Sequence, residues 1–262
     1  MPRRWDGFGP KFEVEWGGRV WALKVDDLMP GLRTDSNQVG PLLALEGVAA
    51  VGRWAPEALS GATLVGYECR FNRVEATYAP LGWGALFVRA AWTPSGFDGI
   101  DLEIQLHAQS VGALRAVEVK LVSRFADPEP SAFHAQRWVE PRDARSAALS
   151  YDRREPDLRG LTTLPPRESA FHSPRLVPGN EADGWLYAEM VHPGDASRRI
   201  REGGRTLALS RTTRYGLFGH DVEKGVVFRA RLRGVWLHSE TAKRDALERF
   251  EQFEQEPLHL ST

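Results

Sequence analysis

Apolar and polar residues alternate along two long segments of the chain. One segment runs from Gly99 to Arg124, and the other runs from Tyr215 to His238. Successive side chains of a strand point to opposite faces of a sheet, so this period of two predicts β-strands. A turn at Val111-Gly112 and a three-residue loop ending at Gly225 interrupt the two segments. The pattern therefore predicts two antiparallel hairpins.

The register of the first hairpin follows from its two faces. Pairing Leu106 with Val117 gathers the apolar side chains on one face, whereas a slip of one residue would mix the faces. The other face carries Asp101, Glu103, Gln105 and His107 against Glu118 and Lys120. Such a row either binds sugar hydroxyls and performs acid–base chemistry or is the solvated face of a sheet. In the second case, Glu103 and Lys120 form a cross-strand ion pair.

The second hairpin separates a core histidine from a charged face. Pairing His220 with Phe228 places both on the apolar face, so His220 is expected in the core. The opposite face carries Asp221, Arg229 and Arg231. These side chains form either an ion-pair network on the outer face or the floor of a cleft. Arginine binds carboxylates through two parallel hydrogen bonds, so an acidic sugar is a candidate ligand there.

Shorter patterns predict the remaining elements. Residues 11–26 form a hairpin around Gly17-Gly18, and strands follow from Leu64 and over 85–92, where Arg89 needs a partner or an exposed end. Residues 185–192 form a strand that contains Glu189 among apolar residues. Helical spacing of Ala and Phe predicts a C-terminal helix at about 240–255, ended by Pro257.

Residues 127–180 differ from the rest of the chain, with eight of the 17 prolines. Aromatic residues argue against full disorder, so we expect a long excursion that packs over a sheet, or alternatively a domain linker. Trp138 in this segment is a candidate ligand-binding residue, because aromatic faces stack on sugar rings and function concentrates on loops.

Composition supports one β-rich domain over residues 1–262. The chain has nine Trp, 12 Phe and 25 Gly, which suits many short strands joined by tight turns. The predicted fold class is all-β, a large antiparallel β-sandwich or supersandwich with a C-terminal helix. The net charge of −1 indicates no nucleic-acid partner, and no apolar run predicts a signal or a membrane span. We expect a cytoplasmic protein.

Sequence motifs for cofactors, metals and activated nucleophiles are missing. The chain contains no glycine-rich phosphate loop, no HExxH and no GxSxG, and it has a single cysteine. We therefore expect no cofactor and no metal. Two acid–base pairs remain as catalytic candidates, Glu103 with His107 and Glu189 with His192. Asp101, Gln105, Asp221, Arg229 and Arg231 are the candidate ligand-binding residues beside Trp138.

The DLEIQ and LRAVEVK strands and the late FGHDVEKG segment resemble the galactose-mutarotase-like β-supersandwiches. The resemblance is one of pattern, spans roughly residues 11–238, and implies carbohydrate binding or modification. Members epimerise aldoses with a Glu base and a His acid, or bind and cleave polysaccharides, although the epimerases' asparagine-and-histidine motif is absent here.

The leading hypothesis is a carbohydrate-binding or carbohydrate-modifying protein with a small-molecule or oligosaccharide ligand. If it is an enzyme, an epimerase-like isomerase or a polysaccharide-processing activity is expected. The alternatives are a non-catalytic sandwich or lipocalin-like barrel that binds an apolar molecule, and a protein without any site. The lining of the main cavity, polar or aromatic, discriminates between sugar and apolar ligands.

Overall fold

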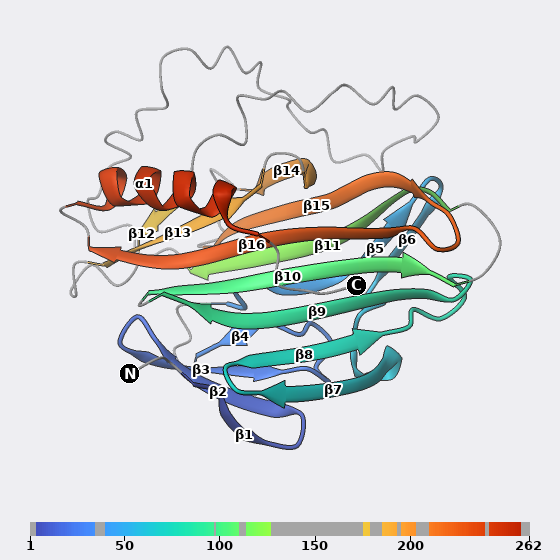
Figure 1. The fold of residues 1–262 in the computed structure, drawn as a ribbon, viewed down its shortest axis with the longest axis horizontal. Coiled ribbons are helices and arrows are strands. Elements are labelled where there is room, and N and C mark those ends of the chain that lie inside the picture. Colours follow the sequence, from blue (N-terminus) through green and yellow to red (C-terminus); the bar gives the residue numbers. More distant parts are fainter. Residues whose placement is uncertain are drawn as a thin grey trace, which may run out of the picture.

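The computed structural model describes residues 4–34, 40–96, 98–109, 114–126, 175–178, 185–192, 195–202, 210–238 and 241–257. These residues form three antiparallel sheets and a C-terminal helix, α1 (Ala242–Gln255). The all-β sandwich class predicted from alternation is confirmed (Figure 1). No helix in this part of the chain is long and apolar enough to cross a membrane.

The largest sheet has seven strands. Its order is β12 (Arg175–Pro178), β13 (Trp185–Val191), β16 (Val227–His238), β10 (Gly99–Ala108), β9 (Leu86–Ser95), β8 (Arg73–Tyr78) and β7 (Leu64–Arg70). The five-stranded sheet runs β14 (Ala196–Glu202), β15 (Ser210–Val222), β11 (Leu114–Ala126), β5 (Ala44–Ala50) and β6 (Arg53–Pro56). The four-stranded sheet runs β1 (Asp6–Phe8), β2 (Lys11–Trp16), β3 (Arg19–Lys24) and β4 (Leu32–Arg33). A short 3₁₀ turn, η1 (Gly61–Thr63), precedes β7.

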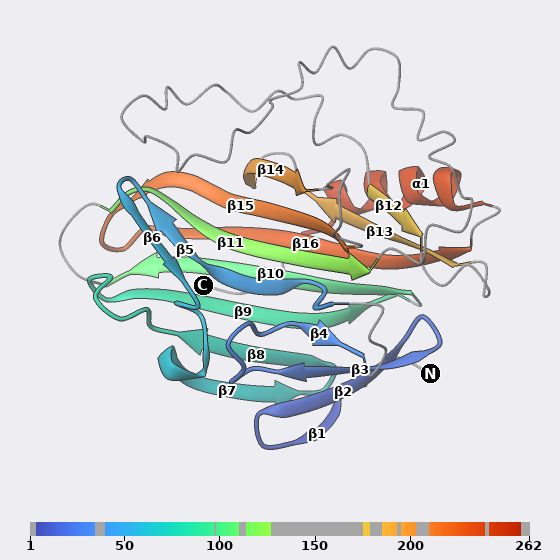
Figure 2. The same cartoon turned by 180° about the vertical axis from the view of Figure 1, so that it is seen from behind.

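The sheets form two layers. Figures 1 and 2 show the seven-stranded sheet on one side and the two smaller sheets on the other. Buried apolar residues from all three sheets join in one core, for example Trp21 of β3, Ile104 of β10 and Val119 of β11. The helix α1 covers part of the opposite, outer face of the seven-stranded sheet, where Phe250 and Phe253 pack with Met190 and Leu237.

Tryptophan side chains fill the core near one end of the sandwich. The ring centroids of Trp16 and Tyr187 lie 5.6 Å apart, and those of Tyr187 and Trp236 lie 5.1 Å apart. Gly17 is required at the adjacent turn, because it has a φ of 58° and a Cβ there would lie 2.5 Å from the Trp236 ring. These aromatic residues pack against each other and against backbone, so they do not line a ligand cavity.

Both long predicted hairpins are wrong, although their strands are correct. β10 pairs with β9 and β16, whereas β11 pairs with β5 and β15, so Leu106 is not the pairing partner of Val117. β15 and β16 likewise belong to different sheets. In both cases the two consecutive strands lie in different layers of the sandwich. An alternating strand has one apolar face whether it pairs with the next strand in a hairpin or packs against it across the core. The alternation therefore does not distinguish a hairpin from a connection between the two layers.

Two further predictions fail with those hairpins. Glu103 and Lys120 are not cross-strand neighbours, since Glu103 lies beside Arg231 and Ala91, while Lys120 pairs with Glu118 of its own strand. His220 is exposed rather than in the core, and its ring stacks on Phe228 at 5.6 Å.

Local predictions fared better. The hairpin over residues 11–26 is confirmed as β2 and β3, and the strand with Glu189 and the C-terminal helix are also confirmed. The excursion predicted over 127–180 lies outside the described residues apart from β12. Trp138 belongs to that excursion.

Candidate functional site

The outer face of the seven-stranded sheet carries polar side chains in rows that cross the strands. Thr77, Arg89, Gln105 and Arg229 are register partners on β8, β9, β10 and β16. The next row contains Glu75, Ala91, Glu103 and Arg231, and the one beyond contains Asp101 beside Arg233. The polar row predicted on β10 therefore exists, with arginines of β16 beside it in place of Glu118 and Lys120.

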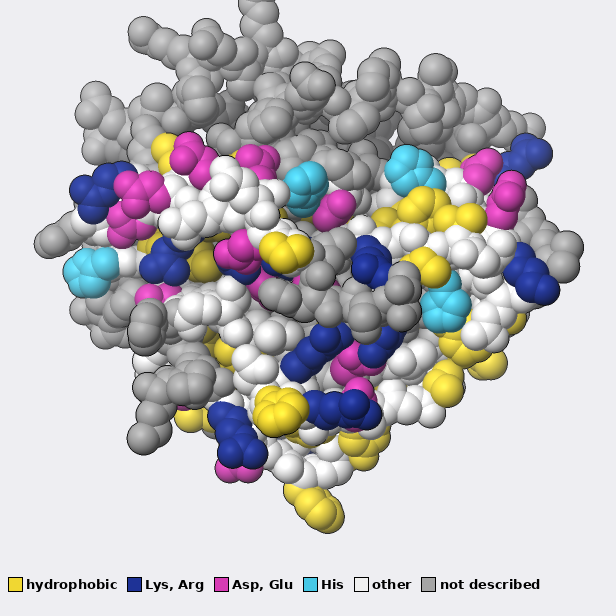
Figure 3. Space-filling model, in the orientation of Figure 1, with side chains coloured by type: hydrophobic (Ala, Val, Ile, Leu, Met, Phe, Trp, Pro, Cys, Tyr) yellow, Lys and Arg dark blue, Asp and Glu magenta, His cyan; other side chains and the backbone are white. Residues whose placement is uncertain are grey.

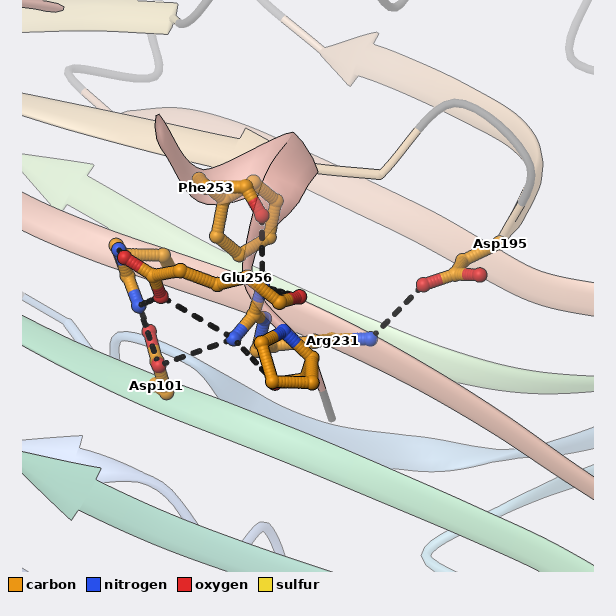
Figure 4. A network of polar contacts seen from close by, with 7 residues as sticks. Asp101, Asp195, Arg231, Phe253 and Glu256 are labelled. Atoms are coloured by element: carbon orange, nitrogen blue, oxygen red, sulfur yellow. Dashed lines mark hydrogen bonds and ion pairs between the residues drawn. The ribbon is translucent and has the colours of Figure 1, made fainter. Parts of the chain in front are cut away.

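One end of this polar face is closed by a network of buried charges (Figure 4). Arg233 donates to both carboxylate oxygens of Asp101, with Nε–Oδ1 and Nη2–Oδ2 distances of 2.6 and 2.7 Å. Arg231 donates through Nη2 to the carbonyl oxygens of Phe253 and Glu256, at 2.7 and 3.1 Å. Because the last carbonyls of a helix lack partners within it, Arg231 caps the C-terminus of α1.

The network holds Arg233 in its charged form. Burial raises the pKa of Asp101, and the hydrogen bonds and charge of Arg233 oppose that rise. Burial acts to lower the pKa of Arg233, but its bonds to Asp101 and Glu256 outweigh burial and raise it. Arg233 is therefore a permanent cation in the fold. Asp101 and Arg231, both predicted to bind ligand, are occupied by contacts within the protein.

The described residues leave the other half of the polar face open. Glu75 of β8 forms ion pairs with Arg73, at 2.8 Å, and with Arg89 of the neighbouring strand. The side chain of Arg89 is 30% exposed, and its Nη1 lies 3.5 Å from Oε1 of Gln105. A shallow groove of about 210 Å³ is lined by Gly66, Tyr67, Glu68, Glu75 and Thr77. Dark blue and magenta side chains gather over β8 and β9 in Figure 3.

Arg229 is the cation of this face that the protein leaves unused. It is half-buried and lies in register beside Gln105, two residues before the capping Arg231. Within the described part of the chain it has no hydrogen-bond or ion-pair partner. A partly buried guanidinium without a partner forfeits solvation, so a ligand oxygen would be favourable at this position.

An aromatic pair borders the open half. The rings of Phe87 on β9 and His107 on β10 stack at 5.3 Å with an angle of 13°. Burial lowers the pKa of His107, and the nearby charge of Arg89 lowers it further. Its Nδ1 is buried without a partner among the described residues. Neutral imidazole is therefore the form present at neutral pH, as a flat surface with one hydrogen-bond donor or acceptor.

Glu189 faces the opposite way, into the core between the layers. The hydroxyls of Tyr187 and Tyr215 donate to its two carboxylate oxygens, at 3.1 and 2.8 Å. A side chain added at its neighbour Gly234 would strike the Tyr187 hydroxyl. Glu189 is thus satisfied by the hydroxyls of two tyrosines.

The remaining predicted residues are spread over the surface. His192 lies 3.9 Å from Asp195, whose Oδ2 accepts a hydrogen bond from the backbone N–H of Arg231. Burial raises the pKa of Asp195, against the effects of Arg231 and His192. Asp221 is exposed on β15 and accepts from the N–H of Ala116, so it does not share a face with Arg229.

Of the four catalytic candidates, Glu103 and His107 share one strand face, while Glu189 lies in the core and His192 at the end of β13. Glu103 and His107 are four residues apart, or roughly 13 Å between Cα atoms at the rise of a strand. The two therefore do not flank one bond in the manner of an acid–base pair. Their catalytic roles stay predictions. No group of three or more metal-binding side chains occurs within the described ranges.

Sequence reasoning missed Glu75, Arg73 and Phe87. One signal was available, because Arg89 stood out as a charge within an apolar strand that needed a partner. That partner is Glu75, which is one strand away and can be identified only once the register of β8 and β9 is known.

No family model matches the chain, and no curated protein matches it either. Among solved structures, heparan sulfate lyase HepC from Pedobacter heparinus is similar over 91% of this chain, with a TM-score of 0.41 and 9% identity. The chain spans 37% of the length of that lyase. A likeness of this degree transfers no activity, so any functional assignment depends on the side chains of the polar face.

Proposed function

We propose that the open half of the polar face binds a carbohydrate that carries an acidic group. The observation that carries the proposal is Arg229, a half-buried cation without a described partner, in register with Gln105 and Arg89. An anionic group at Arg229 would replace the lost solvation of the guanidinium. The other side chains of the row would form hydrogen bonds with the hydroxyl groups of the same ligand.

Hydroxyl recognition needs both donors and acceptors, and the face offers both. Gln105 can donate and accept, Thr77 can do the same through its hydroxyl, and Glu75 accepts. Gln105 and Thr77 lie on β10 and β8, two strand spacings or roughly 9.6 Å apart across the sheet. The stacked Phe87 and His107 rings add a flat surface at the border, against which the apolar face of a sugar ring can pack.

Binding rather than turnover is the function that this arrangement supports best. The predicted bases are not placed opposite the predicted acids, because Glu103 and His107 lie four residues apart along β10 and Glu189 lies in the core. The layering of one large sheet against two smaller ones supports the galactose-mutarotase-like resemblance, and membership of that group is part of the proposal. An apolar ligand is less favoured, because Trp16, Trp21, Trp83 and Trp92 are fully buried core residues and the exposed Trp54 lies on β6 of the five-stranded sheet.

Calorimetric titration with neutral oligosaccharides, with uronate-containing or sulfated ones, and with inorganic sulfate alone tests this function. We expect binding of acidic oligosaccharides, and Arg229→Ala should weaken it by about tenfold or more without loss of stability, because a charge-assisted hydrogen bond is lost. Arg244→Ala is the matched control, since Arg244 is 70% exposed on α1, the helix that covers the other end of this face. Equal affinities for wild type and Arg229→Ala, or binding of sulfate alone, would contradict the proposal.

A further inference from the structure

The strand β7 leaves one edge of the seven-stranded sheet open. It pairs only with β8 within the described part of the chain. Its side chains are unusually apolar for an edge, with Val65 62% and Tyr67 43% exposed, Cys69 exposed, and Phe71 of the adjoining turn 89% exposed. Open edge strands with apolar side chains pair readily with other strands unless they are blocked.

The backbone of β7 is oriented for such pairing. Phe71 and Asn72 form a two-residue turn, so Arg70 and Arg73 are its closing hydrogen-bonded pair. Hydrogen-bonded and non-hydrogen-bonded pairs alternate along an antiparallel ladder. The N–H and C=O groups of Arg70 and Glu68 therefore point toward β8, and those of Cys69 and Tyr67 point toward the free edge.

A second copy of β7 is complementary to the first in one particular register. If two copies run antiparallel about a two-fold axis at Cys69, Glu68 lies opposite the partner's Arg70, and this pair occurs twice. Tyr67 then lies opposite the partner's Phe71. Opposite charges and aromatic pairs are favourable cross-strand neighbours. An axis at Tyr67 would instead place Glu68 opposite Gly66 and Arg70 opposite Leu64, without any charge pairing.

Other exposed apolar side chains lie at the same end of the molecule. β1 and β7 are both at the lower end in Figures 1 and 2, and Phe12 of β2 packs on Tyr67 with the ring centroids 6.1 Å apart. Phe8, the last residue of β1, is 97% exposed. Association at this end would remove apolar area from water as well as pair the two edges.

We propose that two copies of this chain associate by antiparallel pairing of their β7 strands about Cys69. The contact is isologous, as in most homodimers. It joins the two seven-stranded sheets into one continuous sheet. Since a two-fold axis perpendicular to a sheet keeps both outer faces on the same side, the two polar faces lie next to each other.

Sedimentation of charge variants tests the register. Wild type should sediment as a dimer, and Arg70→Glu should raise the dissociation constant by about tenfold or more, because both cross-copy pairs become repulsive. The double variant Glu68→Arg/Arg70→Glu restores opposite charges and should restore association. Within one copy these residues form an exposed pair at 2.8 Å, so the fold should tolerate the exchange.

Cys69 gives an independent readout, because it is the only cysteine in the sequence. Facing residues of a hydrogen-bonded antiparallel pair have Cα atoms about 5.5 Å apart, which is within the range of a disulfide. Copper-phenanthroline oxidation should link wild-type copies several-fold faster than copies of Cys69→Ser/Val20→Cys, whose cysteine would replace an exposed residue of β3. A monomeric wild type, association unaffected by Arg70→Glu, or equal linking of both cysteines would overturn the proposal.

Discussion

Charged residues on the polar face divide into two groups according to how their charge is balanced. Asp101 and Arg233 hold each other through two hydrogen bonds, and Arg231 donates to the carbonyl oxygens at the end of α1. Arg89 is paired with Glu75 but remains partly exposed, and Arg229 has no described partner. The first group supports the fold, so ligand recognition is expected from the second.

His107 makes a prediction at the residue scale. Its folded-state pKa is lowered, so the unfolded chain binds more protons than the folded chain once the pH falls below about 6.5. His107 should therefore reduce stability as the pH falls from 7 toward 5. Urea unfolding across that range should show a smaller loss for His107→Gln than for wild type. The exposed His220→Gln is the control, and parallel curves for wild type and His107→Gln would refute this role.

At the scale of elements, the docking of α1 combines an apolar contact with a polar one. Phe250 and Phe253 pack on Met190 and Val235, while the guanidinium of Arg231 lies 4.3 Å from the centre of the Phe253 ring and caps the helix. Arg231 is 3% exposed, so its contacts are shielded from water and salt. The helix end therefore depends on one buried cation.

Replacing that cation should release the end of the helix. Arg231→Met keeps much of the volume of the side chain but leaves the carbonyls of Phe253 and Glu256 and the carboxylate of Asp101 with fewer partners. We expect a loss of about 3–5 kcal/mol in the free energy of unfolding. Hydrogen exchange should rise first in the last turn of α1. Arg244→Ala should change stability by less than about 0.5 kcal/mol, and similar losses for both variants would contradict the capping role.

At the scale of the whole molecule, the contact between the two layers is the feature that local sequence patterns do not predict. The turn between β2 and β3 belongs to the four-stranded sheet, yet Gly17 touches Trp236 of the seven-stranded sheet. Trp16 donates through Nε1 to the carbonyl oxygen of Asp98 at 2.8 Å, which ties the same two sheets together.

A comparison of Gly17 with its neighbour Gly18 distinguishes the effect of the contact with Trp236 from the effect of backbone strain. Gly17 and Gly18 both have positive φ, but a Cβ at Gly18 meets nothing within 4 Å. Gly18→Ala should cost about 1 kcal/mol through strain alone, whereas Gly17→Ala should cost a further 1–3 kcal/mol, roughly, because it pushes on the Trp236 ring. Denaturant unfolding followed by tryptophan fluorescence measures both. Equal losses would mean that the layers do not press together at this turn.

Local chemistry in the sequence determined the strands, their faces and the helix. Alternation placed Asp101, Glu103 and Gln105 on one face, and the Gly17-Gly18 turn identified the first hairpin, because both signals depend only on neighbouring residues. The same reasoning found that Arg89 needed a partner. These are properties that a strand has before its sheet is assembled.

Tertiary structure alone decided which strands meet. β10 and β11 have facing apolar sides, but they face each other across a core and not across a hydrogen-bonded ladder. The partners of Asp101 come from β16, more than a hundred residues away, and Glu189 turns inward toward Tyr215. Sheet pairing is a long-range choice that a strand's own alternation leaves open, so the composition of the site followed from the fold rather than from any motif.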